Sequence, residues 1–171
     1  GMRVLIRGPY LHPDRAKSLG AELGTLDQVL AEADVLSVHV PLTDGTTGLI
    51  GAAQLARLKK SAFVLNVARG EIIDEAALIE ALRAGSIAGA GLDVYNVEPL
   101  PADHPFRTLE NAVLTPHLGA STAEAQDKAG TSVAEMVRLA LSGEFVPYAV
   151  NVSAGSEVGE VQLDHPADAA G

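Results

Sequence analysis

The sequence predicts an α/β fold in which helices alternate with the strands of a parallel sheet. Two patterns support this prediction. Short apolar runs typical of buried strands recur along the chain, and helices of about 8 to 12 residues, several with capping residues, lie between them. Because parallel strands need a crossover connection, this alternation indicates successive βαβ units.

The first half of the chain contains two predicted strands and three predicted helices. Residues 2–6 form a short apolar run, and Pro13 suits the first position of a helix that extends to about residue 19. Thr25 and Gln28 have the spacing of a capping box, which predicts a helix over residues 26–32. Residues 34–40 predict a strand and residues 52–58 a helix, whereas residues 20–24 are too few to assign.

The second half contains three further strands, over residues 62–67, over residues 87–94 and from Ala112. Asp74 suits the N-cap of a helix that ends at Gly85. Ser121 and Glu124 have capping-box spacing and predict a long helix over about residues 122–142. We expect this helix to pack through apolar residues at helical spacing, which are Ala125, Ala129, Val133, Met136, Val137, Ala140 and Leu141.

Composition excludes several classes of function. The formal net charge is -10 and the pI about 4.8, which disfavours binding to nucleic acids. The sequence has no cysteine, which excludes disulfides and thiolate metal sites, and no apolar run approaches the ~20 residues of a membrane span. This composition is compatible with a cytoplasmic protein.

Four polar residues follow the ends of successive predicted strands. Arg69 and His117 come after two of them, and Asp93 and Glu98 come at and after the end of the strand between. Because the carboxyl ends of parallel strands meet at one edge of a sheet, we expect all four to lie there. Arg can bind a carboxylate through two hydrogen bonds, and His can move a proton near neutral pH. Together they suit the oxidation of a 2-hydroxy acid by a nicotinamide cofactor.

Each of these residues also has a simpler interpretation. Arg69 can be a surface charge, Asp93 a loop cap, Glu98 a solvated acid before Pro99, and His117 a structural histidine. We interpret the other histidines as structural or solvated, namely His12, His39, His104 and His165.

Three segments carry a resemblance to a known family. They read NVARGEIIDEAAL (66–78), AGLDVYNVEPL (90–100) and TPHLGASTAEAQ (115–126). They resemble the nucleotide-binding domain of the D-isomer-specific 2-hydroxyacid dehydrogenases, and the resemblance extends from residue 1 to about residue 152. It implies a Rossmann-like, doubly wound parallel sheet, with NAD as cofactor, a small 2-hydroxy acid as substrate and a homodimer of nucleotide domains.

The resemblance also implies functional residues. The implied catalytic residues are Arg69 for the substrate carboxylate, His117 as acid and base, and Glu98 as its partner. The implied NAD contacts are Val40, Val67, Ala68, Arg69, Asp93, His117, Leu118, Gly119 and Ala120. No metal site is implied.

The sequence departs from the family pattern at its beginning. It contains no G-x-G-x-x-G turn, and we expect the sheet to lack its first strand and its phosphate-binding turn. That absence would expose two apolar strand edges, so we expect an unstable monomer, an oligomer or a rearranged sheet. Gly8 stands where the family usually has an Asp for the adenosine ribose, which leaves NAD or NADP open.

These observations predict that the chain has two parts, and they leave three hypotheses for its function. Residues 1–151 would be a partial nucleotide-binding domain closed by the long helix, and residues 152–171 an acidic, disordered tail. The first hypothesis is a dehydrogenase fragment with little turnover alone. The second is a non-catalytic dimerisation or interaction module that reuses the fold, and the third is a dehydrogenase for glyoxylate, lactate or a similar acid.

Overall fold

A computed structural model describes residues 1–8 and 11–150. The chain divides into two units, Gly1–Gly119 and Ala120–Gly171, which we describe separately. The predicted boundary near residue 151 stays a prediction, and the predicted tail over residues 152–171 lies outside the described residues. No helix in the described part of the chain is long and apolar enough to cross a membrane.

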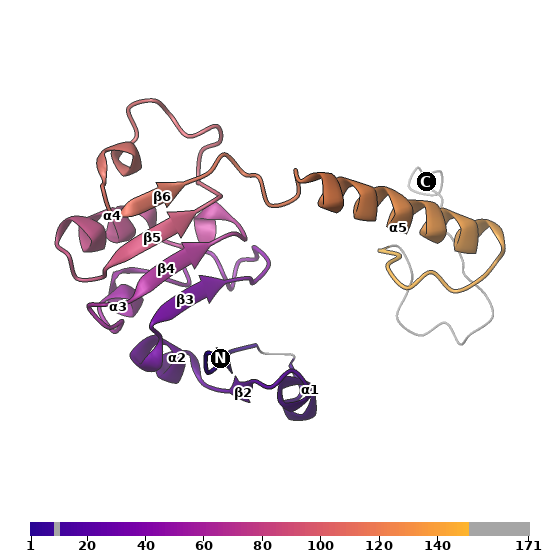
Figure 1. The fold of residues 1–171 in the computed structure, drawn as a ribbon, viewed down its shortest axis with the longest axis horizontal. Helices are drawn as coiled ribbons and strands as arrows, with labels where there is room; N and C mark the ends of the chain where they lie inside the picture. Colours follow the sequence, from indigo (N-terminus) through magenta and orange to yellow (C-terminus); the bar gives the residue numbers. More distant parts are fainter. Residues whose placement is uncertain (9–10, 151–171) are drawn as a thin grey trace, which may run out of the picture. The chain divides into compact units, whose positions relative to one another are not determined.

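A parallel sheet of four strands forms the centre of the first unit (Figure 1). Its order is β3 (Val35–Val38), β4 (Phe63–Asn66), β5 (Gly89–Leu92) and β6 (Ala112–Leu114). Asn66 lies beside Leu92, and Leu92 lies beside Leu114, so three carboxyl ends are in register. The predicted α/β class and parallel sheet are therefore confirmed.

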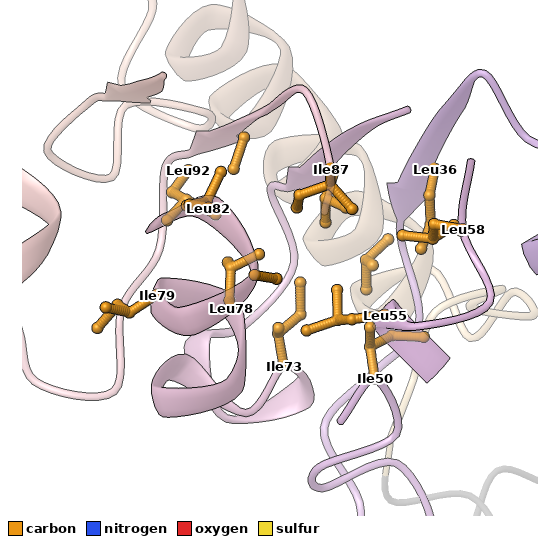
Figure 2. Close-up of a cluster of buried hydrophobic side chains, with 14 of the residues drawn as sticks. Leu36, Ile50, Leu55, Leu58, Ile73, Leu78, Ile79, Leu82, Ile87 and Leu92 are labelled. Atoms are coloured by element: carbon orange, nitrogen blue, oxygen red, sulfur yellow. The ribbon is translucent and has the colours of Figure 1, made fainter. Parts of the chain in front are cut away.

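Helices cover one face of this sheet and bury the core. They are α2 (Leu26–Glu32), α3 (Ala52–Leu55) and α4 (Glu75–Arg83). Inward-facing strand residues such as Leu36 and Leu92 pack in one cluster with Leu55, Leu78 and Leu82 from the helices (Figure 2). Alternate strand residues point to the other face, where large apolar side chains are exposed. These are Val35, Phe63 and Val113.

A separate sheet of two strands precedes the central one. β1 (Leu5–Ile6) pairs in parallel with β2 (Glu22–Leu23), and α1 (Pro13–Ser18) connects them. The short β2 was not predicted, because two residues carry no periodicity. Among the described residues β1 and β3 do not pair with each other, so each leaves one edge open, as the sequence predicts for a sheet without its first strand.

Predicted helix caps agree with the structure at two helices and differ at a third. Thr25 and Gln28 form a capping box on α2, and Asp74 accepts a hydrogen bond from the backbone of Ala77 in α4. The long helix α5 (Ala123–Leu141) is capped by Thr122, which accepts from the backbone of Ala125. The prediction of Ser121 as its cap is therefore wrong by one residue.

No residue of α5 is buried. Val133 is 63% exposed, Val137 52% and Leu141 85%. The expectation that this apolar stripe packs in a core is therefore wrong for the described residues. Helical periodicity shows which residues share a face, but it does not show what covers that face.

Candidate active site

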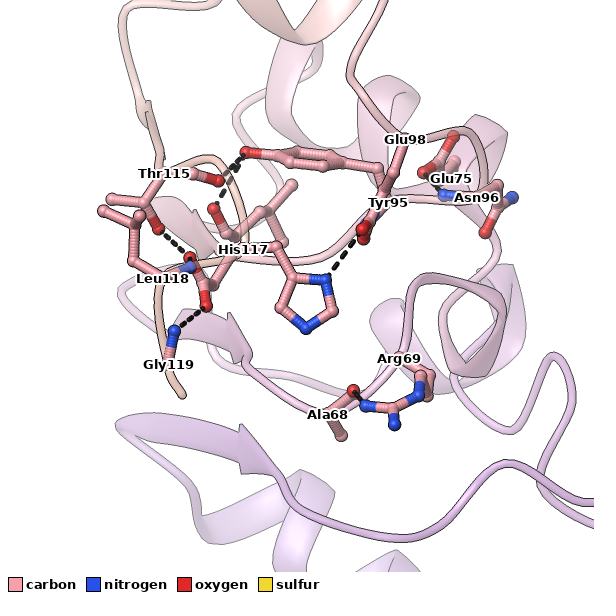
Figure 3. Close-up of polar contacts among 12 residues, drawn as sticks. Ala68, Arg69, Glu75, Tyr95, Asn96, Glu98, Thr115, His117, Leu118 and Gly119 are labelled. Atoms are coloured by element: carbon pink, nitrogen blue, oxygen red, sulfur yellow. Dashed lines mark hydrogen bonds and ion pairs between the residues drawn. The ribbon is translucent and has the colours of Figure 1, made fainter. Parts of the chain in front are cut away.

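The carboxyl edge of the central sheet holds all four predicted polar residues. Asp93 directly follows β5, and Arg69 and His117 each come three residues after the in-register ends of β4 and β6. Glu98 lies in the loop after β5. The expected convergence on one edge therefore holds, and Figure 3 labels Arg69, Glu98 and His117 among the residues of this edge.

Glu98 and His117 form a direct pair. The Nδ1 atom of His117 lies 2.7 Å from Oε2 of Glu98, and the other carboxylate oxygen accepts from the backbone N–H of Tyr95 at 3.0 Å. The hydrogen bond from His117, helped by the one from Tyr95, lowers the pKa of Glu98 below its ordinary value. A charged carboxylate at Nδ1 fixes the tautomer that leaves Nε2 free to accept a proton.

The turn that carries His117 has an unusual backbone. His117 has φ 56°, the left-handed region, and is the one non-glycine residue in the described part of the chain with positive φ. Such a conformation persists only where the surroundings hold it, and it is often found at functional sites.

Asp93 supplies those surroundings. Its carboxylate accepts from the backbone N–H groups of Leu118 at 2.8 Å and Gly119 at 2.9 Å, and from the hydroxyl of Thr115. Asp93 is only 7% exposed. The Asp93 carboxylate thus connects the end of β5 to Thr115, which directly follows β6, and to the histidine turn, a role that the sequence did not indicate.

The electrostatics of Asp93 follow from these contacts. Burial raises the pKa of the Asp93 carboxyl, but hydrogen bonds from Thr115, Leu118 and Gly119 outweigh it, so that the pKa lies below its ordinary value of 3.8. Since the folded protein binds this proton less tightly than the unfolded chain, the charged carboxylate stabilises the fold above about pH 4. That stability is lost as the pH falls through the lowered pKa.

Replacing Asp93 by asparagine should therefore destabilise the first unit by about 2 kcal/mol at pH 7, because an amide cannot accept from all three donors. The difference between variant and wild type should begin to shrink below about pH 4, where the unfolded chain takes up the proton, and should vanish as the pH falls through the lowered pKa of Asp93 in the folded protein. Urea unfolding across this pH range measures both effects, with Asp44→Asn in an exposed loop as the control. Equal stability of Asp93→Asn and wild type at pH 7 would contradict this account.

Arg69 is exposed at the end of β4. Its guanidinium donates one hydrogen bond, of 2.6 Å, to the carbonyl of Ala68, and it forms no ion pair within the described residues. Asn66, a buried side chain that sequence reasoning missed, holds this turn by donating to the carbonyl of Arg69 at 2.9 Å. The guanidinium therefore keeps donors available for an anionic ligand.

A cavity of about 510 Å³ adjoins the pair of Glu98 and His117. Tyr95, Leu100 and Arg107 line it, whereas Arg69 does not. Arg107 donates to the carbonyls of Pro101 and Leu100, both at 2.8 Å, and so supports the loop after Glu98. The described residues contain no cluster of side chains suited to a metal ion.

The edge thus combines a paired histidine, an exposed guanidinium and exposed apolar side chains, which include Val67 (51% exposed) and Leu118 (48%). Such a set can bind an anion, exchange a proton and pack against an aromatic ring system. Sequence reasoning found the charged residues but missed Asn66, Tyr95 and Thr115. The one feature of the sequence that could have indicated these three residues is the presence of a polar residue inside or beside an apolar strand.

Comparison with known proteins identifies the relatives of this chain. A family model described as "D-isomer specific 2-hydroxyacid dehydrogenase, NAD binding domain" matches residues 1–119. The chain is 54% identical over 155 residues to a protein of Mycobacterium leprae (strain TN) named D-3-phosphoglycerate dehydrogenase, which covers 91% of this chain and 29% of that protein. It is 43% identical over 151 residues to a glyoxylate reductase of Korarchaeum cryptofilum, covering 88% of this chain and 46% of the relative.

A solved structure agrees with these relatives. The NAD-complexed D-isomer specific 2-hydroxyacid dehydrogenase of Lactobacillus delbrueckii ssp. bulgaricus matches with a TM-score of 0.78 and 31% identity, over 87% of this chain and 48% of that one. The chain spans less than half the length of each of these three proteins. The resemblance seen in the sequence is confirmed, and the chain belongs to the D-isomer specific 2-hydroxyacid dehydrogenases, a family of NAD-dependent oxidoreductases, through their Rossmann-like NAD-binding domain.

Proposed function

We propose that this protein transfers a hydride between C2 of a 2-hydroxy acid and NAD, with 3-phosphoglycerate as the substrate, and that it serves serine biosynthesis in the cytoplasm. The observation that carries the proposal is the pair of Glu98 and His117 at the carboxyl edge of the sheet. Identity of 54% to a protein named D-3-phosphoglycerate dehydrogenase supports the choice of substrate.

In this proposal His117 and Glu98 move the proton. Nε2 of His117 takes the C2 hydroxyl proton as the C2 hydride leaves, which turns the alcohol into a ketone, and NAD when bound accepts that hydride. The charged Glu98 stabilises the imidazolium that forms. Arg69 holds the substrate carboxylate through its free N–H groups.

The residues at the edge suit the cofactor. The exposed side chains of Val67 and Leu118 offer apolar contacts to its rings, and Gly119 adds no side chain between Asp93 and a bound molecule. The remaining members of the proposed contact set are Val40, Ala68, Arg69, Asp93, His117 and Ala120. Gly8 after β1 provides no carboxylate for an adenosine 2′-hydroxyl, and the neighbouring Arg7 is exposed, so NADP is tested beside NAD.

The proposal is tested by turnover of the natural protein with saturating 3-phosphoglycerate and NAD, followed at the absorbance band of NADH. Glyoxylate with NADH tests the other activity named among the relatives. Turnover with another 2-hydroxy acid but not with 3-phosphoglycerate would replace the substrate. No turnover and no NADH binding would favour a non-catalytic interaction module, because the sequence has no G-x-G-x-x-G turn.

We also propose that the protein is a homodimer in which α5 contacts a second copy of the chain. Val133, Val137 and Leu141 are spaced four residues apart and form one exposed apolar stripe. Val137→Glu should shift the protein from dimer to monomer, as measured by analytical ultracentrifugation. Thr131→Glu adds the same charge about 120° around the helix from Val137 and should leave the dimer intact. A wild-type monomer at micromolar concentration would contradict the proposal.

A further inference from the structure

The loop that carries Glu98 is held at both ends by one carboxylate on another element. Glu75, the first residue of α4, accepts a hydrogen bond from the backbone N–H of Asn96 through Oε1 at 2.7 Å. Its other oxygen lies 3.5 Å from Nε2 of His104. Asn96 precedes Glu98 by two residues and His104 follows it by six, so the two contacts bracket the segment that presents Glu98.

Both partners are well placed to hold a fixed geometry. The side chains of Glu75 and His104 are each only 17% exposed. His104 also caps the short 3-10 helix η2 (Pro105–Thr108), where its Nδ1 accepts from the backbone of Phe106. With Nδ1 accepting, Nε2 carries the proton, and this nitrogen lies 3.5 Å from Oε2 of Glu75. The contact therefore does not require a charged histidine.

Glu75 is itself tied to the arginine turn. The 3-10 helix η1 (Gly70–Ile72) leads from Arg69 to α4, and the backbone of Gly70 packs directly against Tyr95 and Asn96. Asp74 caps α4 immediately before Glu75. The carboxylate therefore extends from a rigid helix start, which also favours negative charge.

A short chain of contacts connects Glu75 to the proton-transfer pair. Glu75 holds the N–H of Asn96, the neighbouring Tyr95 donates its own N–H to Glu98, and Glu98 accepts from Nδ1 of His117. Figure 3 shows Glu75 and Asn96 on one side of Tyr95 and Glu98, with His117 on the other. A displacement of Asn96 would thus move the adjoining N–H of Tyr95, which holds Glu98 in line with His117.

We propose that Glu75 is a positioning residue of the site, which sets the alignment of Glu98 with His117 by bridging Asn96 and His104. The proposal rests on the proposed function for its catalytic meaning. Glu75 itself does not touch substrate or cofactor, and its effect passes through the loop of residues 96–104. A purely structural role would alter stability and leave the state of the His117 ring unchanged.

The first experiment uses the 171-residue chain labelled uniformly with 15N, so that both the ring of His117 and the backbone amide of Asn96 are observed. In Glu75→Ala the ring 15N shifts of His117 should move towards those of an imidazole without a carboxylate partner, and the Asn96 amide should exchange faster with solvent. Glu75→Gln retains an acceptor for Asn96 and should restore most of the wild-type shifts. Glu80→Ala removes an exposed carboxylate from the same helix and should change neither signal.

A second variant covers the case in which Glu75→Ala does not fold. His104→Asn retains a cap for η2 but is too short to reach Glu75, so it removes one of the two contacts. It should shift the His117 ring signals in the same direction by a smaller amount. Unchanged ring signals in a folded Glu75→Ala, or in His104→Asn, would overturn the proposal.

Kinetics of the natural protein separate this proposal from the proposed function. Glu75→Ala should lower kcat roughly tenfold to a hundredfold, with little change in the KM for NAD, because misplacement of a proton-transfer group affects the chemical step. Ring shifts that change in a protein without dehydrogenase activity would refute the function and keep the positioning role. Activity that depends on His117 but not on Glu75 would support the function and refute the positioning role.

Discussion

Replacement of His117 by alanine is expected to lower kcat for oxidation of the 2-hydroxy acid by about 10²- to 10⁴-fold, the usual contribution of a general base. The pair with Glu98 at 2.7 Å is the reason, since no other histidine among the described residues contacts a carboxylate this closely. Substrate KM should change less, because the proposal gives substrate binding to Arg69. The measurement is NADH formation under saturating conditions.

Two further variants sharpen this result. Glu98→Gln keeps an acceptor for His117 but removes the charge, so kcat should fall by a smaller factor than in His117→Ala. Because hydrogen bonding to His117 keeps the pKa of Glu98 below its ordinary value, the carboxylate stays charged across the neutral range, and its loss should be felt there. His12→Ala, at the exposed cap of α1, is the control and should leave kcat unchanged. Full activity in His117→Ala would remove the basis of the proposed function.

Replacement of Gly70 by alanine is expected to destabilise the first unit by about 3 kcal/mol or more, which places it among the larger effects of single substitutions. A Cβ at this position would lie 2.5 Å from the backbone nitrogen of Asn96 and closer still to the carbonyl group of Tyr95. Backbone atoms cannot rotate away as a flexible side chain can. The turn after β4 and the loop after β5 would have to separate, and these segments carry Arg69 and Glu98.

Urea denaturation measures this loss, with Gly45→Ala as the control. Gly45 lies in an exposed loop, where the one neighbour of a new Cβ is a hydroxyl at 4.0 Å, so its replacement should change stability by less than about 0.5 kcal/mol. A Gly70→Ala protein as stable as the control would mean that the two loops do not pack as described.

Local patterns in the sequence were sufficient for the strands of the central sheet, for the α-helices and for the charged site residues. Apolar runs located the four strands of the central sheet, and the caps of α2 and α4 were visible as Thr25 with Gln28 and as Asp74. Parallel strands place their carboxyl ends together, so the convergence of Arg69, Asp93, Glu98 and His117 followed from topology alone. The family resemblance added the roles that those residues are proposed to have.

The sequence did not show how the shortest strand pairs or whether the apolar face of the last helix is buried. The strand β2 is too short to show a period, and the apolar face of α5 gave no sign that it would be exposed. Ser121 and Thr122 have equally suitable side-chain chemistry for a helix cap, so the sequence did not decide between them. In the structure the cap of α5 is Thr122.

The sequence by itself determined the alternation of strands and helices and the sheet edge at which Glu98 and His117 lie, because each depends on periodicity or on strand direction. Only the tertiary structure assigned Asp93 to the histidine turn, Gly70 to the contact between two loops, and Glu75 to Asn96 and His104. These contacts join residues about 20 to 30 positions apart in the chain, and their partners are set by how neighbouring strands and helices pack. Contacts between residues so far apart in the chain are not visible in any local pattern of side chains.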